Sequence, residues 1–179
     1  SDFEILINPF PILPVHFTMP SKRHELQQIK TYFPVMLDFV EQNPESFIFY
    51  NGPRSGASAP DHMHFQAGFV KDIPFYNQTA TVPEVTSGST LLRHINWPGA
   101  CVSIIGKEKQ AVIEEFNNIY EALPIPTGEY EPMFNVFARK DNDNYEVTFF
   151  LRSQHRPSCY GMEKENRLVS PGALDMAGL

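Results

Sequence analysis

The 179-residue sequence has few cysteines, no surplus of basic charge and no long apolar run, and each shortage excludes a class of protein. Cys101 and Cys159 stand far apart without metal-ligand spacing, which favours a reduced, cytoplasmic setting. The chain has 14 Lys and Arg residues and 21 Asp and Glu residues, which gives a net charge of −7. It therefore has no basic surplus to neutralise a nucleic-acid backbone. No stretch approaches the ~18 apolar residues of a membrane span, and no signal peptide is visible. We expect no nucleic-acid and no membrane partner.

The remaining composition is that of an ordinary globular domain, with 42% hydrophobic and 20% charged residues. The length fits a single domain covering residues 1–179 and suffices for a proper core. A strand already begins near Phe3, and the tail from Ser170 to Leu179 stops in an apolar stretch, whereas natural termini are usually polar. These ends suggest a segment of a longer protein.

Hydrophobic periodicity predicts more strands than helices. Alternating or β-branched runs predict strands over residues 3–8, 15–19, 46–50, 62–70, 90–97, 101–106, 133–139 and 145–152. Helical spacing of apolar residues predicts helices over residues 22–40 and 107–123, the first broken or kinked at Pro34. Asp141-Asn-Asp-Asn144 between the last two strands indicates an antiparallel hairpin. The fold class is therefore α+β, with a largely antiparallel sheet and flanking helices.

The motif that carries chemistry is His-Met-His-Phe-Gln at residues 62–66. Side chains alternate along a strand, so His62, His64 and Gln66 should face one surface. Directly before them lies a loop over residues 51–60, rich in Gly, Ser and Pro, whose N–H groups and hydroxyls suit an anion. Covalent nucleotidyl transfer requires this combination, because a neutral imidazole attacks phosphorus while nearby donors neutralise the phosphoryl oxygens.

A pair of histidines alternating on a strand also fits two simpler roles. The rings could be ordinary surface residues, or half of a metal site completed by a distant His155 or Cys159. A cupin-like metal site would place a carboxylate a few residues downstream, where residues 67–70 are Ala-Gly-Phe-Val. The Gly/Ser loop favours phosphate over metal, since a metal site has no need of it.

The segment 51–66 resembles the active-site segment of the galactose-1-phosphate uridylyltransferase branch of the histidine-triad (HIT-like) superfamily. That branch also holds the dinucleoside polyphosphate phosphorylases. Residues 7–24 are similar to the superfamily's opening hairpin, although Val15 stands where glycine is usual, and residues 170–174 resemble the closing segment of the phosphorylases. The motif followed by Pro74-Phe75 looks most like GDP-L-galactose phosphorylase and its bacterial relatives. The resemblance implies a HIT-like fold and a possible homodimer. Some members hold zinc with Cys-x-x-Cys, which is absent here, so no metal and no cofactor is expected.

The resemblance also implies roles for single residues. His64 would be the nucleophile that becomes nucleotidylated, and His62 would orient it through its backbone carbonyl. Gln66 takes the third triad position, where hydrolases place His. Because an amide cannot act as a general acid or base near neutral pH, glutamine at this position favours transfer over hydrolysis. Further substrate or phosphate contacts are expected from Asn51, Ser55, Gly56, Ser58, Asn8, Arg54 and Arg152. Weaker candidates for phosphate are Lys71 and Arg156, whereas His16, His94 and Trp97 are interpreted as structural.

The leading hypothesis is a nucleotidyltransferase of the phosphorylase type. Its substrate would be a nucleoside diphosphate sugar or a dinucleoside polyphosphate, and its acceptor inorganic phosphate. The alternatives are a HIT-like nucleotide-binding protein without turnover, a nucleotide hydrolase, and the metal-binding protein described above. The sequence leaves the base and the sugar open.

Overall fold

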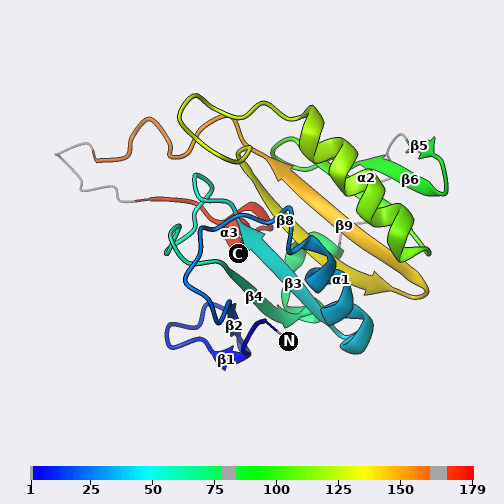
Figure 1. The fold of residues 1–179 in the computed structure, drawn as a ribbon, viewed down its shortest axis with the longest axis horizontal. Coiled ribbons are helices and arrows are strands. Elements are labelled where there is room, and N and C mark those ends of the chain that lie inside the picture. Colours follow the sequence, from blue (N-terminus) through cyan, green and yellow to red (C-terminus); the bar gives the residue numbers. More distant parts are fainter. Residues whose placement is uncertain (1, 78–83, 162–168) are drawn as a thin grey trace.

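The computed structural model describes residues 2–77, 84–161 and 169–179 (Figure 1). The strands within these ranges form a nine-stranded antiparallel sheet in the order β1-β2-β4-β3-β8-β9-β7-β6-β5. They are β1 (Leu6–Ile7), β2 (Phe17–Pro20), β3 (Ser46–Asn51), β4 (His64–Phe69), β5 (Glu84–Ser87), β6 (Thr90–His94), β7 (Cys101–Gly106), β8 (Phe134–Asp141) and β9 (Asn144–Leu151). The helices are α1 (Phe33–Gln42), α2 (Lys109–Ala122) and the short α3 (Ala173–Met176), with 3₁₀ turns η1 (Val70–Asp72) and η2 (Pro74–Asn77). The predicted α+β class with a largely antiparallel sheet is confirmed.

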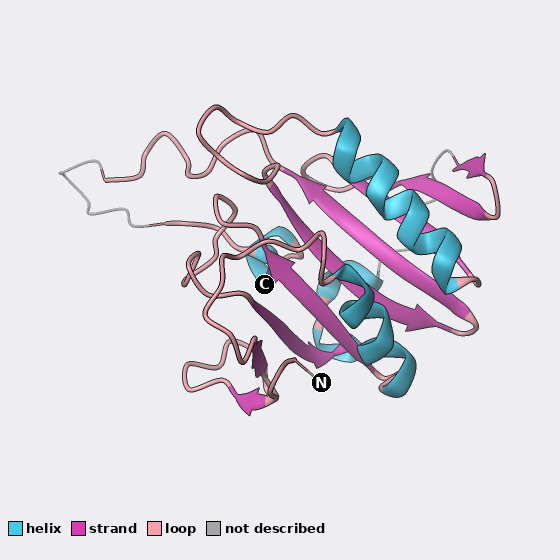
Figure 2. Cartoon of the chain, in the orientation of Figure 1, coloured by secondary structure: helices cyan, strands magenta, loops and turns pink. Residues whose placement is uncertain are grey.

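The two faces of the sheet have separate apolar cores, because strand side chains alternate. Helices α1 and α2 cover one face, where Ile48 and Tyr50 of β3 pack (Figure 2). Phe33 of α1 stacks on Phe116 of α2 with ring centroids 3.7 Å apart, which joins the two helices. The opposite face holds Phe47 and Phe49 of β3, covered by the turn segment 70–77 and by α3. That second face also carries the polar site described below.

Helix α1 begins later than its periodicity predicts. The pattern from Lys22 predicted a helix, yet residues 22–32 are irregular and the helix starts at Phe33, so this part of the prediction was wrong. Pro34 lies in the first helical turn, where a missing N–H is harmless and the fixed φ favours helix. Segment 22–32 instead pairs its backbone with residues 60–63: Gln27 N–H donates to the Pro60 carbonyl and Met63 N–H donates to the Glu25 carbonyl.

The remaining elements lie where the sequence predicts them, but the strand predicted over residues 3–8 is only Leu6–Ile7, and the one predicted over residues 90–97 ends at His94. The β8–β9 hairpin and α2 are confirmed to within two residues of their predicted bounds. Strand β4 begins at His64 and not at His62, and the chain after Phe69 turns into η1. Strand β5 and helix α3 were not predicted. Both are only four residues long, too short to show a period.

None of the helices within the described ranges is both long and apolar enough to cross a membrane.

Candidate active site

His64 begins β4 and is held almost entirely out of solvent, with 7% of its surface exposed. Its Nδ1 lies 2.8 Å from the backbone carbonyl oxygen of His62. A carbonyl only accepts, so Nδ1 carries the hydrogen and the lone pair of the neutral ring lies on Nε2. Burial lowers the pKa of His64, which keeps the ring neutral at neutral pH. The outcome is a neutral imidazole whose lone pair lies on Nε2.

Gln66 follows His64 on the same face of β4, and its amide is fixed by His16. The Ile12 N–H donates to His16 Nδ1 (3.1 Å), so His16 Nε2 carries the hydrogen and donates to Gln66 Oε1 at 2.7 Å. Burial lowers the pKa of His16 and favours this neutral form. Since Oε1 is occupied, the amide nitrogen of Gln66 is the group left to donate to a substrate.

His62 lies just before β4, and its ring turns toward the irregular segment at Ser21. His62 Nε2 donates to the Ser21 carbonyl at 2.8 Å, and the ring packs edge-on against His24 with centroids 5.1 Å apart. The His62 side chain therefore has a partner of its own, whereas its backbone carbonyl holds His64. The carbonyl contact is the one that the superfamily resemblance implies.

A cavity of about 320 Å³ is lined by Gln66, whereas His62 and His64 are not among its lining residues. The three side chains predicted to face one surface therefore do not form one continuous row, because β4 begins only at His64 and the His62 ring turns toward Ser21. The walls of the cavity are formed by Gln66, by the loop residues Gly56 and Ser58, by side chains of the opening hairpin, and by residues 170–175. The full lining is Asn8, Phe10, Ile12, His16, Phe49, Asn51, Gly56, Ser58, Gln66, Ser170, Gly172, Ala173, Leu174 and Asp175. Among these described residues Asp175 is the only Asp, Glu, Lys or Arg, so a bound phosphate would depend on neutral donors. The side chains of Phe10 and Ile12 in the hairpin give this cavity an exposed apolar edge.

Loop residues 52–60 are shaped by the tail of the chain. Gly56 has φ +92°, and a Cβ there would lie 2.5 Å from Gly172 Cα, so only glycine fits. The Ser55 side chain is fully buried, and its hydroxyl has no hydrogen-bond partner among the described residues. Ser58 is exposed and lines the cavity. Of the two serines predicted to bind phosphate, Ser58 is therefore the accessible one.

The side chain of Asn51 binds the tail segment 170–175 through Ala173. Its Oδ1 accepts from Ala173 N–H at 2.7 Å and from Asn135 Nδ2 at 2.8 Å. Asn135 Nδ2 also donates to the Ser55 carbonyl, which ties loop, strand β8 and α3 together. Asn8 lies in the cavity lining as expected, with its amide held by Thr18 Oγ1 and by Phe10 N–H.

The predicted arginines lie away from this cavity. Arg152 donates to the backbone carbonyls of Pro171 and His155, so its guanidinium braces the tail. Arg54 pairs with Glu129 at 3.1 Å. Together with Arg156, Arg54 lines a neighbouring cavity that shares Ser58 and Ser170 with the first. The two arginines thus lie across the 52–60 loop from Gln66, in a cavity that also holds the carboxylates of Asp61 and Glu129.

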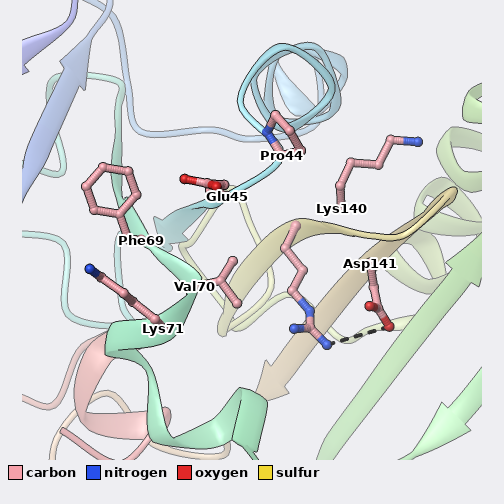
Figure 3. Close-up of a pocket in the computed structure, with 8 residues that line it drawn as sticks. Pro44, Glu45, Phe69, Val70, Lys71, Lys140 and Asp141 are labelled. Carbon is pink, nitrogen blue, oxygen red and sulfur yellow. Dashed lines mark ion pairs between the residues drawn. The ribbon is translucent and has the colours of Figure 1, made fainter.

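Lys71 belongs to a different hollow, at the far end of β4 from His64 (Figure 3). It contains Lys140 and Asp141 of β8 and none of the predicted site residues other than Lys71. Among the described residues there is also no cluster of three or more His, Cys, Asp or Glu side chains that could hold a metal ion.

Three contributors to the site were not predicted from the sequence. Gln27 is fully buried and bonds to the backbone of His64, Asn135 supports the loop, and the tail residues 170–175 form one wall of the cavity. Gln27 lies in a stretch whose periodicity imitates a helix, and single Gln and Asn residues carry no motif. The resemblance of residues 170–174 to the phosphorylases was the one available signal.

Comparison with known proteins places this site in context. A domain of unknown function (DUF4922) matches residues 1–69. Galactose-1-phosphate uridylyltransferase of Bifidobacterium longum is 30% identical over 116 residues, which is 62% of this chain and 21% of that protein. The chain therefore spans about a fifth of the length of this curated relative.

Two solved structures share the fold. A DUF4931 family protein from Bacillus cereus superimposes with a TM-score of 0.58 at 17% sequence identity. The match covers 96% of this chain and 91% of the Bacillus cereus chain. Yeast Ap4A phosphorylase Apa2 superimposes with a TM-score of 0.50 at 18% sequence identity. That match covers 82% of this chain and 55% of the Apa2 chain. The fold is similar to the HIT-like fold of Apa2, and part of the chain is distantly similar in sequence to a galactose-1-phosphate uridylyltransferase.

Proposed function

We propose that the chain is a nucleotidyltransferase of the phosphorylase type that forms a nucleotidyl intermediate on His64. The observation that carries the proposal is the Nδ1 contact of His64 with the His62 carbonyl, since it leaves the lone pair on Nε2. The distant similarity to a uridylyltransferase and to an Ap4A phosphorylase supports the same chemistry. Substrates of the proposed reaction are nucleoside diphosphate sugars, a GDP-sugar among them, or dinucleoside polyphosphates.

In the first step, His64 Nε2 bonds to the α-phosphorus, and the bond from that phosphorus to the bridging oxygen breaks. The bridging oxygen leaves with the electron pair as a sugar phosphate or nucleotide. The ring becomes cationic, and the His62 carbonyl stabilises its Nδ1–H. The amide nitrogen of Gln66 and the hydroxyl of Ser58 donate to the phosphoryl oxygens. A phosphate leaving group departs as an anion, so the step needs no general acid, in agreement with glutamine at this position.

In the second step, an oxygen of inorganic phosphate attacks the nucleotidyl phosphorus and the P–N bond breaks. A nucleoside diphosphate is released and His64 returns to its neutral form. Arg156 lines the cavity across the loop, on the side from which we propose that the acceptor phosphate enters, whereas Arg54 of the same cavity is paired with Glu129.

The test is incubation of the protein with GDP-, UDP- and ADP-sugars and dinucleoside polyphosphates, first without phosphate. We expect a nucleotide mass on His64 by mass spectrometry, and its loss as nucleoside diphosphate when phosphate is added. His64→Ala should lower turnover by at least about 10³-fold, because the variant lacks the group that forms the intermediate. The rate should also fall below neutral pH as His64, whose pKa is lowered by burial, becomes protonated.

Turnover of His64→Ala at the native rate would disprove the mechanism. Tight nucleotide binding without turnover across the panel would favour a binding protein. Release of nucleoside monophosphate independent of added phosphate would favour a hydrolase.

A further inference from the structure

The sheet opens between β3 and β4 at the end that carries His64. The paired register of these strands ends at Phe49 opposite Gln66. Continued by two residues on each strand, it would place Asn51 opposite His64. The structure does not pair them there, which leaves the N–H and C=O groups of two buried strand ends in need of partners.

The side chain of Gln27 fills this opening. Its Oε1 accepts from His64 N–H at 2.8 Å, and its Nε2 donates both to the His64 carbonyl and to the Asn51 carbonyl at 3.0 Å each. Gln27 is fully buried, so these bonds are shielded from water. One amide thus replaces the missing bonds of the ladder and connects the strand of the nucleophile to the strand that leads into the 52–60 loop.

Gln27 is itself held firmly. Its backbone N–H donates to the Pro60 carbonyl at 3.1 Å. Two residues later, Ile29 N–H donates to the buried Glu131 carboxylate at 2.8 Å. The backbone that carries the amide is thus fixed at Gln27 itself and at Ile29.

We propose that Gln27 is a positioning residue for His64. The partner of His64 Nδ1 is the carbonyl only two residues earlier in the same chain, so the ring direction follows the backbone at 62–64. Gln27 fixes that backbone relative to Asn51 and hence relative to the loop that would hold the phosphate. Without the amide, the chain retains His64 but loses the direction of Nε2. This inference rests on the proposed function, since it concerns the same nucleophile.

The first experiment compares Gln27→Met, which keeps the length of the side chain and removes all three bonds, with the exposed neighbour variant Gln28→Met as control. Diadenosine tetraphosphate and GDP-glucose serve as probes. We expect Gln27→Met to slow nucleotidylation of His64 by about 10–100-fold while KM changes less than about threefold, because misorientation affects the reacting atom more than binding. Gln28→Met should behave as the native protein.

A second variant, Gln27→Glu, gives a signature that a loss of stability does not produce. The Glu carboxylate still accepts from His64 N–H, but its ionised form faces two carbonyl oxygens that it cannot bond. Its protonated form recovers one donor. We therefore expect the rate of this variant to fall as pH rises through the pKa of the new carboxyl, a descending limb absent from the native protein.

The third measurement does not depend on turnover. In ¹⁵N NMR of the imidazole, native His64 should be a neutral ring with its hydrogen on Nδ1, and Gln27→Met should shift it toward a mixture of tautomers. If the native protein forms no nucleotidyl-histidine, the proposed function fails and the NMR result still decides the role of Gln27. Unchanged tautomer and rate in folded Gln27→Met, or no new pH limb in Gln27→Glu, overturn the inference.

Discussion

At the scale of single residues, the hydrogen on one nitrogen of His16 determines what Gln66 offers to a substrate. The Ile12 N–H occupies Nδ1, so Nε2–H donates to Gln66 Oε1 and the Gln66 amide nitrogen is left toward the cavity. A freely rotating amide would present its oxygen to a phosphate in part of the population, and oxygen repels phosphate. His16, which the sequence pattern indicated as structural, therefore contacts one of the predicted catalytic residues.

We predict that His16→Ala lowers kcat by about 10-fold, the scale of losing one neighbour that orients a catalytic group. Steady-state kinetics on dinucleoside polyphosphate or GDP-sugar measures the change. His94→Ala, at the exposed end of β6, is the control and should retain full activity. A kcat within about twofold of the native value in folded His16→Ala would show that Gln66 needs no partner.

At the scale of elements, the short helix α3 forms part of the site because contacts on both of its sides hold it. Asn51 Oδ1 accepts from Ala173 N–H, and Gly172 lies so close to Gly56 that no Cβ fits between them. Phe75 N–H donates to the Ala177 carbonyl, and Trp97 Nε1 donates to the Met176 carbonyl, on the far side of α3. A four-residue helix has no stability alone, so these contacts place it.

We predict that Gly56→Ala destabilises the protein more than Gly128→Ala does. Both glycines have positive φ, +92° and +82°, so each substitution carries a backbone strain of about 1–3 kcal/mol. At Gly128 nothing among the described residues lies within 4 Å of the added Cβ, whereas at Gly56 the Cβ collides with the backbone of Gly172. Urea unfolding of both variants gives the difference, which isolates the contribution of the docked tail. Equal losses would mean that the tail does not press on the loop.

At the scale of the whole molecule, a buried carboxylate links the helix face of the sheet to the site. Glu131 is 1% exposed and accepts hydrogen bonds from Ile29 N–H and the Tyr50 hydroxyl. Burial raises its pKa from 4.5 to about 7, although these hydrogen bonds act in the opposite direction. The carboxylate supports the segment that carries Gln27 and is itself poorly solvated.

The raised pKa makes folding stability depend on pH. A group that binds its proton more tightly when folded contributes stability that is complete below pH 4.5 and is lost as pH rises to about 7. We predict that Glu131 lowers the free energy of unfolding by on the order of 3 kcal/mol across this interval. Urea unfolding between about pH 4 and pH 8 measures the slope. Glu131→Gln should flatten it, and Glu114→Gln, on the exposed face of α2, should leave it unchanged. If Glu131→Gln kept the native dependence of unfolding free energy on pH, a group other than Glu131 would be responsible.

The sequence was sufficient for features that depend on local pattern. Alternation and turn residues predicted the β8–β9 hairpin, helical spacing predicted α2, and the run of strands predicted an antiparallel α+β fold. The motif at 62–66 and the loop before it indicated where a phosphate site should lie. The catalytic roles of His64, His62 and Gln66 stay predictions until the variants are measured.

Tertiary structure decided what depends on partners distant in the chain. The apolar spacing over 22–32 fits a helix, but the backbone of that segment is taken by residues 60–63, and Gln27 thereby reaches His64. Arg152 is equally suited by sequence to phosphate or to carbonyls, and only the position of Pro171 shows that it braces the tail. Local periodicity reports which residues can be buried together, whereas the partner of a buried amide or guanidinium is set by contacts between segments, which no single stretch of sequence encodes.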